Sequence, residues 1–231
     1  NKLDIKSLKS EKPKIDFIND FEHNYIVITN GELTLSNFKY EEKSKVKLKS
    51  FINDNYSGKK ENNPLVNLNH ALSDKGYFLE VKENYKFKKI LVIYYLFTED
   101  LNENILNSKN KIVIGKNSEI HLLDYLINVS KKNFFNNVYE DVILGSSARL
   151  KNIYLQKDKS SGYFHKYSKN RLSAGANFSS FIFPTGLKFN KLDLEFNLEG
   201  ENCECNLQSA SFLSQQEHQE IKTQINHFYP N

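Results

Sequence analysis

The chain contains two cysteines, Cys203 and Cys205, with a single residue between them. Side chains alternate between the two faces of a β-strand, so both thiols would lie on one face about 7 Å apart, from a rise of about 3.4 Å per residue. Such a pair could supply half of a cysteine-rich metal or cluster site, but its spacing suits a disulfide poorly. Because Leu207 follows on the same face and cysteine often packs as a small apolar side chain, we predict a packing role for both cysteines.

Six histidines are spread along the chain without a metal-binding spacing. No His-x-x-x-His or Cys-x-x-Cys pattern occurs, so the sequence contains no recognisable zinc motif. His227 would share a strand face with Ile225, and we interpret it as a strand or turn histidine with a structural partner. The six are His23, His70, His121, His165, His218 and His227.

Residues 163–171 mix aromatic and basic side chains, as a surface for single-stranded nucleic acid would. Because no second strip of this kind occurs, we interpret the stretch from Tyr163 to Arg171 as a solvated corner. The chain also lacks a Gly-x-Ser-x-Gly nucleophile motif and a phosphate-binding loop. The chain itself should therefore not hydrolyse nucleotide, and the sequence predicts no catalytic, cofactor-binding or metal-binding residues.

The composition is that of a folded protein and not of a membrane-spanning, collagen-like or disordered one. Of 231 residues, 39% are hydrophobic and 26% are charged, and no run of about 18 apolar residues occurs. The net charge is +4, yet Arg149 and Arg171 are the only arginines, whereas nucleic-acid binders usually concentrate arginine. We therefore expect neither a membrane nor a nucleic-acid partner. Methionine is absent, so we interpret the chain as a piece of a longer protein.

Residues 1–74 are expected to form a small N-terminal region with mixed α and β structure. Residues 1–20 are rich in lysine and weakly patterned, which indicates a partly ordered arm. The Asn30-Gly31 pair lies between two β-branched runs and predicts a β-hairpin. Residues 41–62 are polar, and we expect them to form a loop.

A short helix is expected to close this N-terminal region. Asn63 suits the N-cap position, and proline follows it at the first helical position. The predicted apolar stripe of the helix consists of Leu65, Leu68 and Leu72, and Gly76 is the expected terminator.

Residues 75–231 are expected to consist of strands. Glycine recurs at four of the intervening corners, at positions 115, 145, 175 and 200, which are steps of 30, 30 and 25 residues. This spacing is typical of a solenoid whose turns stack on one another, whereas a β-sandwich, the alternative, would turn every 8–12 residues or so. We therefore predict a mainly β fold with a parallel β-helix. The expected strands are residues 77–81, 89–97, 111–114, 119–123, 137–144, 149–156, 178–183, 187–198, 203–212 and 220–228.

The C-terminal part of the sequence resembles the SufB/SufD family of iron–sulfur cluster assembly proteins. The family pattern has a glycine-led acidic corner, here Gly200-Glu-Asn-Cys-Glu-Cys, and then a strand in which Ser209 replaces the usual glycine. A Thr-x-Ile-x-His-x-x-Pro strand follows, here Thr223, Ile225, His227 and Pro230. Residues 135–150 also look like a turn of that family, and residues 63–76 resemble the SufD branch. The resemblance covers about residues 25–231.

This resemblance implies a right-handed parallel β-helix in a non-catalytic cytoplasmic scaffold that pairs with SufB and binds the ATPase SufC. The complex of that family builds transient iron–sulfur clusters, so no cofactor is expected in this chain, and flavin in the complex is left open. In the family, SufC docks on helices beyond the β-helix, where a Cys-Ser-His-Gly-type cluster motif also lies. We therefore expect both after Asn231. The resemblance leaves open whether a homodimer or the SufB heterocomplex is preferred.

A β-helix enzyme or binding protein acting on carbohydrates is the alternative function. Polysaccharide-cleaving β-helices usually cluster Asp, Arg or Lys on one sheet face. In this sequence the strand acids are dispersed and arginine is nearly absent. These features favour the scaffold.

Overall fold

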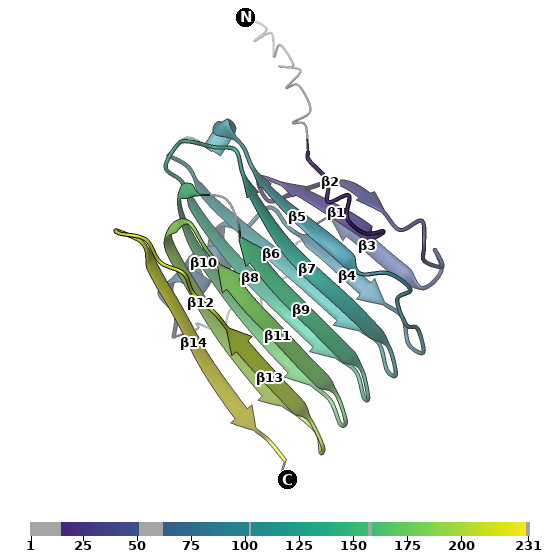
Figure 1. The fold of residues 1–231 in the computed structure, drawn as a ribbon. Helices are drawn as coiled ribbons and strands as arrows, with labels where there is room; N and C mark the ends of the chain where they lie inside the picture. The colour runs from purple at the N-terminus through teal and green to yellow at the C-terminus, as the bar shows by residue number, and fades with distance from the viewer. Residues whose placement is uncertain (1–14, 51–61, 102, 157–158, 230–231) are drawn as a thin grey trace, which may run out of the picture.

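Two seven-stranded β-sheets face each other across a common core (Figure 1). The computed structural model describes residues 15–50, 62–101, 103–156 and 159–229. From β4 onward the chain alternates between the sheets, so even-numbered strands lie in sheet B and odd-numbered strands in sheet A. Five successive strand pairs, β4–β5 to β12–β13, stack as turns of a parallel β-solenoid. The expected mainly β fold with a parallel β-helix is therefore confirmed.

Sheet A has the strand order β13-β11-β9-β7-β5-β1-β2, and sheet B has the order β14-β12-β10-β8-β6-β4-β3. Neighbouring strands are parallel except at one end, where β2 is antiparallel to β1 and β3 to β4. The strands of sheet A are β1 (Asn24–Thr29), β2 (Glu32–Asn37), β5 (Leu91–Phe97), β7 (Glu119–Asn128), β9 (Arg149–Gln156), β11 (Asn177–Pro184) and β13 (Glu204–Ser209). Those of sheet B are β3 (Val46–Ser50), β4 (Tyr77–Val81), β6 (Ile105–Ile114), β8 (Phe135–Leu144), β10 (Ser160–Leu172), β12 (Leu187–Leu198) and β14 (His218–His227).

The N-terminal strands belong to the same two sheets as the solenoid. Asn30 and Gly31 have φ values of 48° and 83°, so the predicted hairpin between β1 and β2 is confirmed. β1 also pairs in parallel with β5, which places the hairpin at the end of sheet A. Phe17 and Ile18 pack on the outer face of this sheet against Val27 and other buried side chains. The prediction for residues 1–14 lies outside the described residues.

Helix α1 (Pro64–Leu72) packs over β6 and β8 on the outer face of sheet B. The Asn63 side chain accepts a hydrogen bond from the backbone N–H of Leu65, as predicted for the N-cap. The predicted leucine stripe is wrong, because Val66 and Asn69 are the buried residues and Leu72 is 58% exposed. Asn69 belongs to this face because it donates to backbone carbonyls of the sheet.

Gly76 is not the terminator of α1, because the helix ends at Ser73 in extended backbone. A Cβ at Gly76 would lie 1.9 Å from the carbonyl oxygen of Lys109. The glycine therefore permits close approach of two strands instead of capping the helix.

The corners from sheet B to sheet A all lie on one side of the solenoid, as expected from the glycine spacing. Their glycines meet two different requirements. Gly115 packs so closely on the preceding turn that a Cβ would lie 2.5 Å from the backbone nitrogen of Glu83. Gly175 instead has a φ of +69° and occupies the left-handed position filled by Asn117 and Ser147 in neighbouring corners.

Two expected loops are strands. Residues 163–171, predicted to be a solvated corner, lie within β10 in the middle of sheet B. The sequence of this stretch does not alternate between apolar and polar residues, because Lys166, Ser168 and Asn170 point into the core region, where apolar side chains are usual. Part of the expected loop at 41–62 is the edge strand β3, and residues 51–61 lie outside the described ranges.

Candidate functional site

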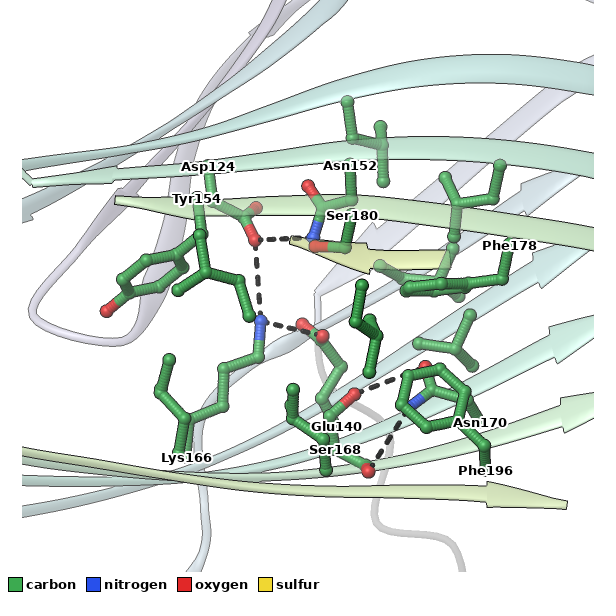
Figure 2. A pocket seen from close by; sticks show the side chains of 18 residues that line it. Asp124, Glu140, Asn152, Tyr154, Lys166, Ser168, Asn170, Phe178, Ser180 and Phe196 are labelled. Atoms are coloured by element: carbon green, nitrogen blue, oxygen red, sulfur yellow. Dashed lines mark hydrogen bonds and ion pairs between the residues drawn. The ribbon is translucent and has the colours of Figure 1, made fainter. Parts of the chain in front are cut away.

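The interior of the solenoid contains a cluster of charged side chains between its two sheets. Asp124 on β7 of sheet A faces Glu140 on β8 and Lys166 on β10, both in sheet B (Figure 2). Asp124 and Glu140 are buried and the side chain of Lys166 is 13% exposed, because even-numbered positions of β8 and β10 point inward and the opposite sheet covers them. The cluster lies among aliphatic and aromatic side chains such as Leu192 and Phe178.

Lys166 joins the two sheets electrostatically. Its Nζ atom lies 2.7 Å from Glu140 Oε1 and 3.4 Å from Asp124 Oδ2. Asn152 Nδ2 also donates to Asp124 Oδ2 at 3.4 Å. Burial opposes the ammonium form of Lys166, but the carboxylates of Glu140 and Asp124 outweigh it and raise the pKa of this lysine.

Glu140 is the less well compensated carboxyl group of the cluster. Its burial raises the pKa, and the charge of Asp124 adds to this, while Lys166 acts in the opposite direction. Its second oxygen, Oε2, is buried without a hydrogen-bond partner among the described residues. The cavity beside the cluster has a volume of about 30 Å³, enough for one or two water molecules but not for a sugar or a nucleotide.

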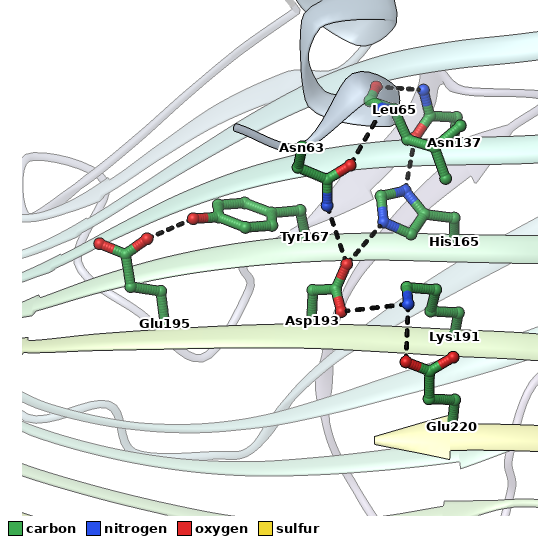
Figure 3. A network of polar contacts seen from close by, with 9 residues as sticks. All are labelled: Asn63, Leu65, Asn137, His165, Tyr167, Lys191, Asp193, Glu195 and Glu220. Atoms are coloured by element: carbon green, nitrogen blue, oxygen red, sulfur yellow. Dashed lines mark hydrogen bonds and ion pairs between the residues drawn. The ribbon is translucent and has the colours of Figure 1, made fainter. Parts of the chain in front are cut away.

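A second polar network holds α1 on the outer face of sheet B (Figure 3). His165 is 1% exposed and lies between Asn137 Oδ1 at 2.7 Å and Asp193 Oδ2 at 3.1 Å. Asn137 Nδ2 donates to the carbonyl oxygen of Leu65 in the helix, and Asn63 Nδ2 donates to Asp193. Asn137 and Asp193 therefore link the helix and its N-cap residue to sheet B, and His165 joins these two side chains.

The acidic residues of this outer face are paired with cations of the same sheet. Lys191 lies 2.7 Å from Glu220 and 3.7 Å from Asp193, and Arg171 donates to both oxygens of Asp141. Burial lowers the pKa of His165, although Asp193 acts against this. The network consequently stabilises packing and leaves little carboxylate surface free for a substrate.

The two cysteines contact the core next to the last corner. Cys203 lies in that corner, with Sγ 3.0 Å from the carbonyl oxygen of Gly200, and Cys205 lies within β13. Both are half-buried and pack against the larger hydrophobic cluster together with Leu207. Burial raises the pKa of Cys205 to about 11, which opposes formation of the thiolate that a metal requires.

The histidines occupy separate environments. His23 contacts the Tyr94 hydroxyl at 2.8 Å, and His121 lies 3.4 Å from Glu119. His218 stacks on Phe189, and His227 is exposed at the end of β14. Across the ranges that the structure describes, no group of three His, Cys, Asp or Glu residues is arranged to hold a metal ion.

The interior cluster was not found by sequence reasoning. Its residues lie 16 to 42 positions apart, and their meeting depends on the register of strands in different sheets. A sequence signal does exist, because Lys166 has the same parity as Phe164 and Leu172. Alternation alone would therefore place this lysine on the buried face.

Comparison with known families gives one finding. The family model described as SUF system FeS cluster assembly, SufBD core domain, matches residues 96–231, which is more than half of the chain. The matched segment begins at the end of β5 and includes all later turns of the solenoid. No match to the chain was found among curated proteins. Within the described residues, no helix is long and apolar enough to cross a membrane.

Proposed function

The chain belongs to the SufBD family of SUF-system iron–sulfur cluster assembly proteins, and we propose that it is a non-catalytic scaffold subunit of the SufD type. It would pair with a SufB-like subunit and act in the cytoplasm with a SufC-like ATPase. The match of the solenoid to the SufBD core domain is the observation that carries this proposal. The iron–sulfur cluster is cargo of the complex and not a resident cofactor of this chain.

The charged side chains of the solenoid join elements of the fold to one another, and this supports the proposed scaffold role. Lys166 bridges two sheets, and Asp193 joins His165 to Asn63 ahead of the helix. Both sets of contacts hold elements of the fold in place. The paired acids of sheet B likewise favour a scaffold over a carbohydrate-active enzyme, which would need carboxylates free to reach its substrate.

The helix supports assignment to the SufD branch. Its sequence, from Asn63 to Gly76, resembles that branch, and the structure packs it on the solenoid just before β4. The two cysteines also suit a subunit that does not hold the cluster, because both pack against the core.

Co-expression of the tagged chain with SufB-like and SufC-like proteins from the same organism tests this function. We expect the chain to retain both proteins through affinity and size-exclusion chromatography. When the SufB-like protein is omitted, retention of the SufC-like ATPase should be lost. A chain that purifies alone in the presence of both partners, or that cleaves acidic polysaccharides, would contradict the proposal.

Titration calorimetry locates the ATPase site. We expect a SufC-like ATPase titrated into this 231-residue chain to give no measurable heat of binding. A stable interface buries about 1,200–2,000 Å² in total, and by family resemblance helices beyond the β-helix supply that surface. Micromolar binding to this chain would instead place the docking site on the solenoid or on the N-terminal segments.

A further inference from the structure

We propose that the interior cluster of Lys166, Asp124 and Glu140 is a buried proton-binding site, in which Glu140 is a neutral carboxylic acid at neutral pH and Lys166 lies between the two carboxyl groups. This inference concerns the solenoid itself and does not depend on the proposed place of the chain in a complex. Its basis is the number of charges, their partners and the enclosure of the site.

When all three groups of the cluster are ionised, one additional positive charge would be needed to make the cluster neutral. One ammonium and two carboxylates carry a net charge of −1 when all three are ionised, and the side chains around them are mostly apolar. An uncompensated charge in such surroundings is costly, and two carboxyl groups that share one site do not ionise equally. Binding one proton makes the cluster neutral.

The hydrogen-bond pattern assigns the proton to Glu140. Asp124 Oδ2 accepts from two donors, Asn152 and Lys166, each at 3.4 Å. Glu140 accepts from Lys166 at Oε1 and is also reached by Asn110, but its Oε2 atom is buried without a hydrogen-bond partner among the described residues. Protonation of Oε2 removes the negative charge from this unpartnered oxygen. The resulting O–H group can donate a hydrogen bond to a water molecule in the adjoining cavity.

Among the described residues that act on Glu140, no cation other than Lys166 is present to neutralise it. Lys166 and Asp124 act on it from β10 and β7, and a hydrogen bond from Asn110 reaches it from β6. The remaining titratable neighbours are tyrosines, whose pKa values burial raises, so they stay uncharged: Tyr77 on β4, Tyr95 on β5 and Tyr154 on β9. A metal cation is disfavoured because the ammonium of Lys166 already occupies the space between the carboxylates.

The site makes the stability of the solenoid depend on pH in a defined direction. Because the folded protein holds a proton on Glu140 that the unfolded chain releases near pH 4.5, stability falls as pH rises from that value to the folded pKa. A Glu140 paired as an anion with Lys166 would give the opposite slope in acid, with stability lost as pH falls.

Infrared spectroscopy of the full chain, with isotope-labelled glutamate, tests the proton directly. We expect the carbonyl band of a protonated glutamic acid to be present at pH 7.5 and to be lost in Glu140→Gln. The absence of this band from the wild-type protein at pH 7.5 would overturn the proposal, and this measurement requires no variant to fold.

Urea unfolding of wild type and Glu140→Gln from pH 4.5 to pH 8.5 gives the second test. Glutamine mimics the neutral acid, so the midpoint of the variant should equal or exceed that of wild type at pH 8.5, with the difference growing as pH rises. Asp141→Asn is the matched control, because Asp141 lies on the outer face of the same strand beside Arg171, and it should not show this growth. A variant midpoint below wild type whose deficit grows from pH 4.5 to pH 6.5 would overturn the proposal. So would wild-type stability that depends on the identity of the alkali cation.

Discussion

Buried charged side chains in this protein are matched by partners on other strands or segments. Glu41 is 8% exposed and accepts from Asn24, from the Tyr85 hydroxyl and from the backbone N–H of Lys88. Because an unpaired charge in the interior is expensive, each such carboxylate fixes the position of the segments that carry its donors. The single residues therefore hold together parts of the chain that are distant in sequence.

Cys205 is predicted to react slowly with thiol reagents in the folded protein. Burial raises its pKa to about 11 from an ordinary value of 9.0, so the thiolate fraction at pH 8 should be lower by about 100-fold. Alkylation of a Cys203→Ser variant at pH 8, followed by mass spectrometry, measures this reactivity, and the same variant in urea is the control. Equal rates in the folded and unfolded states would contradict the packing role.

His70 is predicted to stay neutral well below the usual pH of histidine titration. Burial lowers its pKa to about 4, and Lys109 and Lys169 add to this effect. Between about pH 6.5 and pH 4 the His70 ring binds a proton in the unfolded chain but not in the folded one. This residue therefore makes the free energy of unfolding decrease as pH falls. Two-dimensional NMR should give a midpoint below pH 5 for His70, and a midpoint near 6.5 would show that its ring is solvated.

The turns of the solenoid are joined by corners whose backbone geometry is repeated from one turn to the next. Asn117, Ser147, Gly175 and Asn202 all adopt positive φ values between 55° and 69°. Gly115, Gly145 and Gly200 each pack closely on the preceding corner, which is why some corners also need a residue without a side chain. The elements are therefore specified by strand alternation together with this recurrent left-handed position.

Substitutions in two corners should separate close packing from backbone conformation. Gly115→Ala introduces a Cβ against the backbone of Glu83, and we expect it to lower the free energy of unfolding by about 1–3 kcal/mol. Gly175→Asn places asparagine where Asn117 and Asn202 already adopt the same φ, and should cost less than about 1 kcal/mol. Urea unfolding with unchanged m-values measures both. A larger loss for Gly175→Asn would contradict this distinction.

The whole molecule is a stack of turns in which each turn contacts mainly its immediate neighbours. β8 and β10 have strands on both sides, whereas β13 and β14 are the last described strands of their sheets and have one neighbour each. The exposed apolar side chains include Phe212, Ile225 and Phe228 at this end. In such an array, stability comes from the interface between turns, so it should vary along the stack.

Hydrogen exchange of the full chain should reveal this gradient. We expect amides of β8 and β10 to exchange most slowly and those of β13 and β14 to exchange faster, because the last turn lacks a second interface. Mass spectrometry of peptic peptides from the 231-residue chain provides the measurement. Uniform protection across all turns would indicate that the solenoid opens only as one cooperative unit.

The Asn30-Gly31 hairpin and the helix start at Asn63 could be predicted because each depends on local chemistry, and the parallel solenoid could be predicted because glycine recurs at its corners in steps of 30, 30 and 25 residues. Strand alternation, a turn dipeptide and a capping side chain act over a few residues, so their signals are contiguous in the sequence.

Only the tertiary structure decided which polar residues are buried and with which partners they pair. The sequence did not indicate β10 because its inward positions include Lys166 and Asn170. The charge of Lys166 is compensated by Glu140 and Asp124 on other strands. Asn170 Nδ2 donates to the carbonyl oxygens of Ser168 and Glu195. The buried face of α1 was likewise set by Asn69, whose amide bonds to carbonyl groups of β6 and β8. A buried polar group needs partners that only the stacked register supplies, and no local pattern encodes that register.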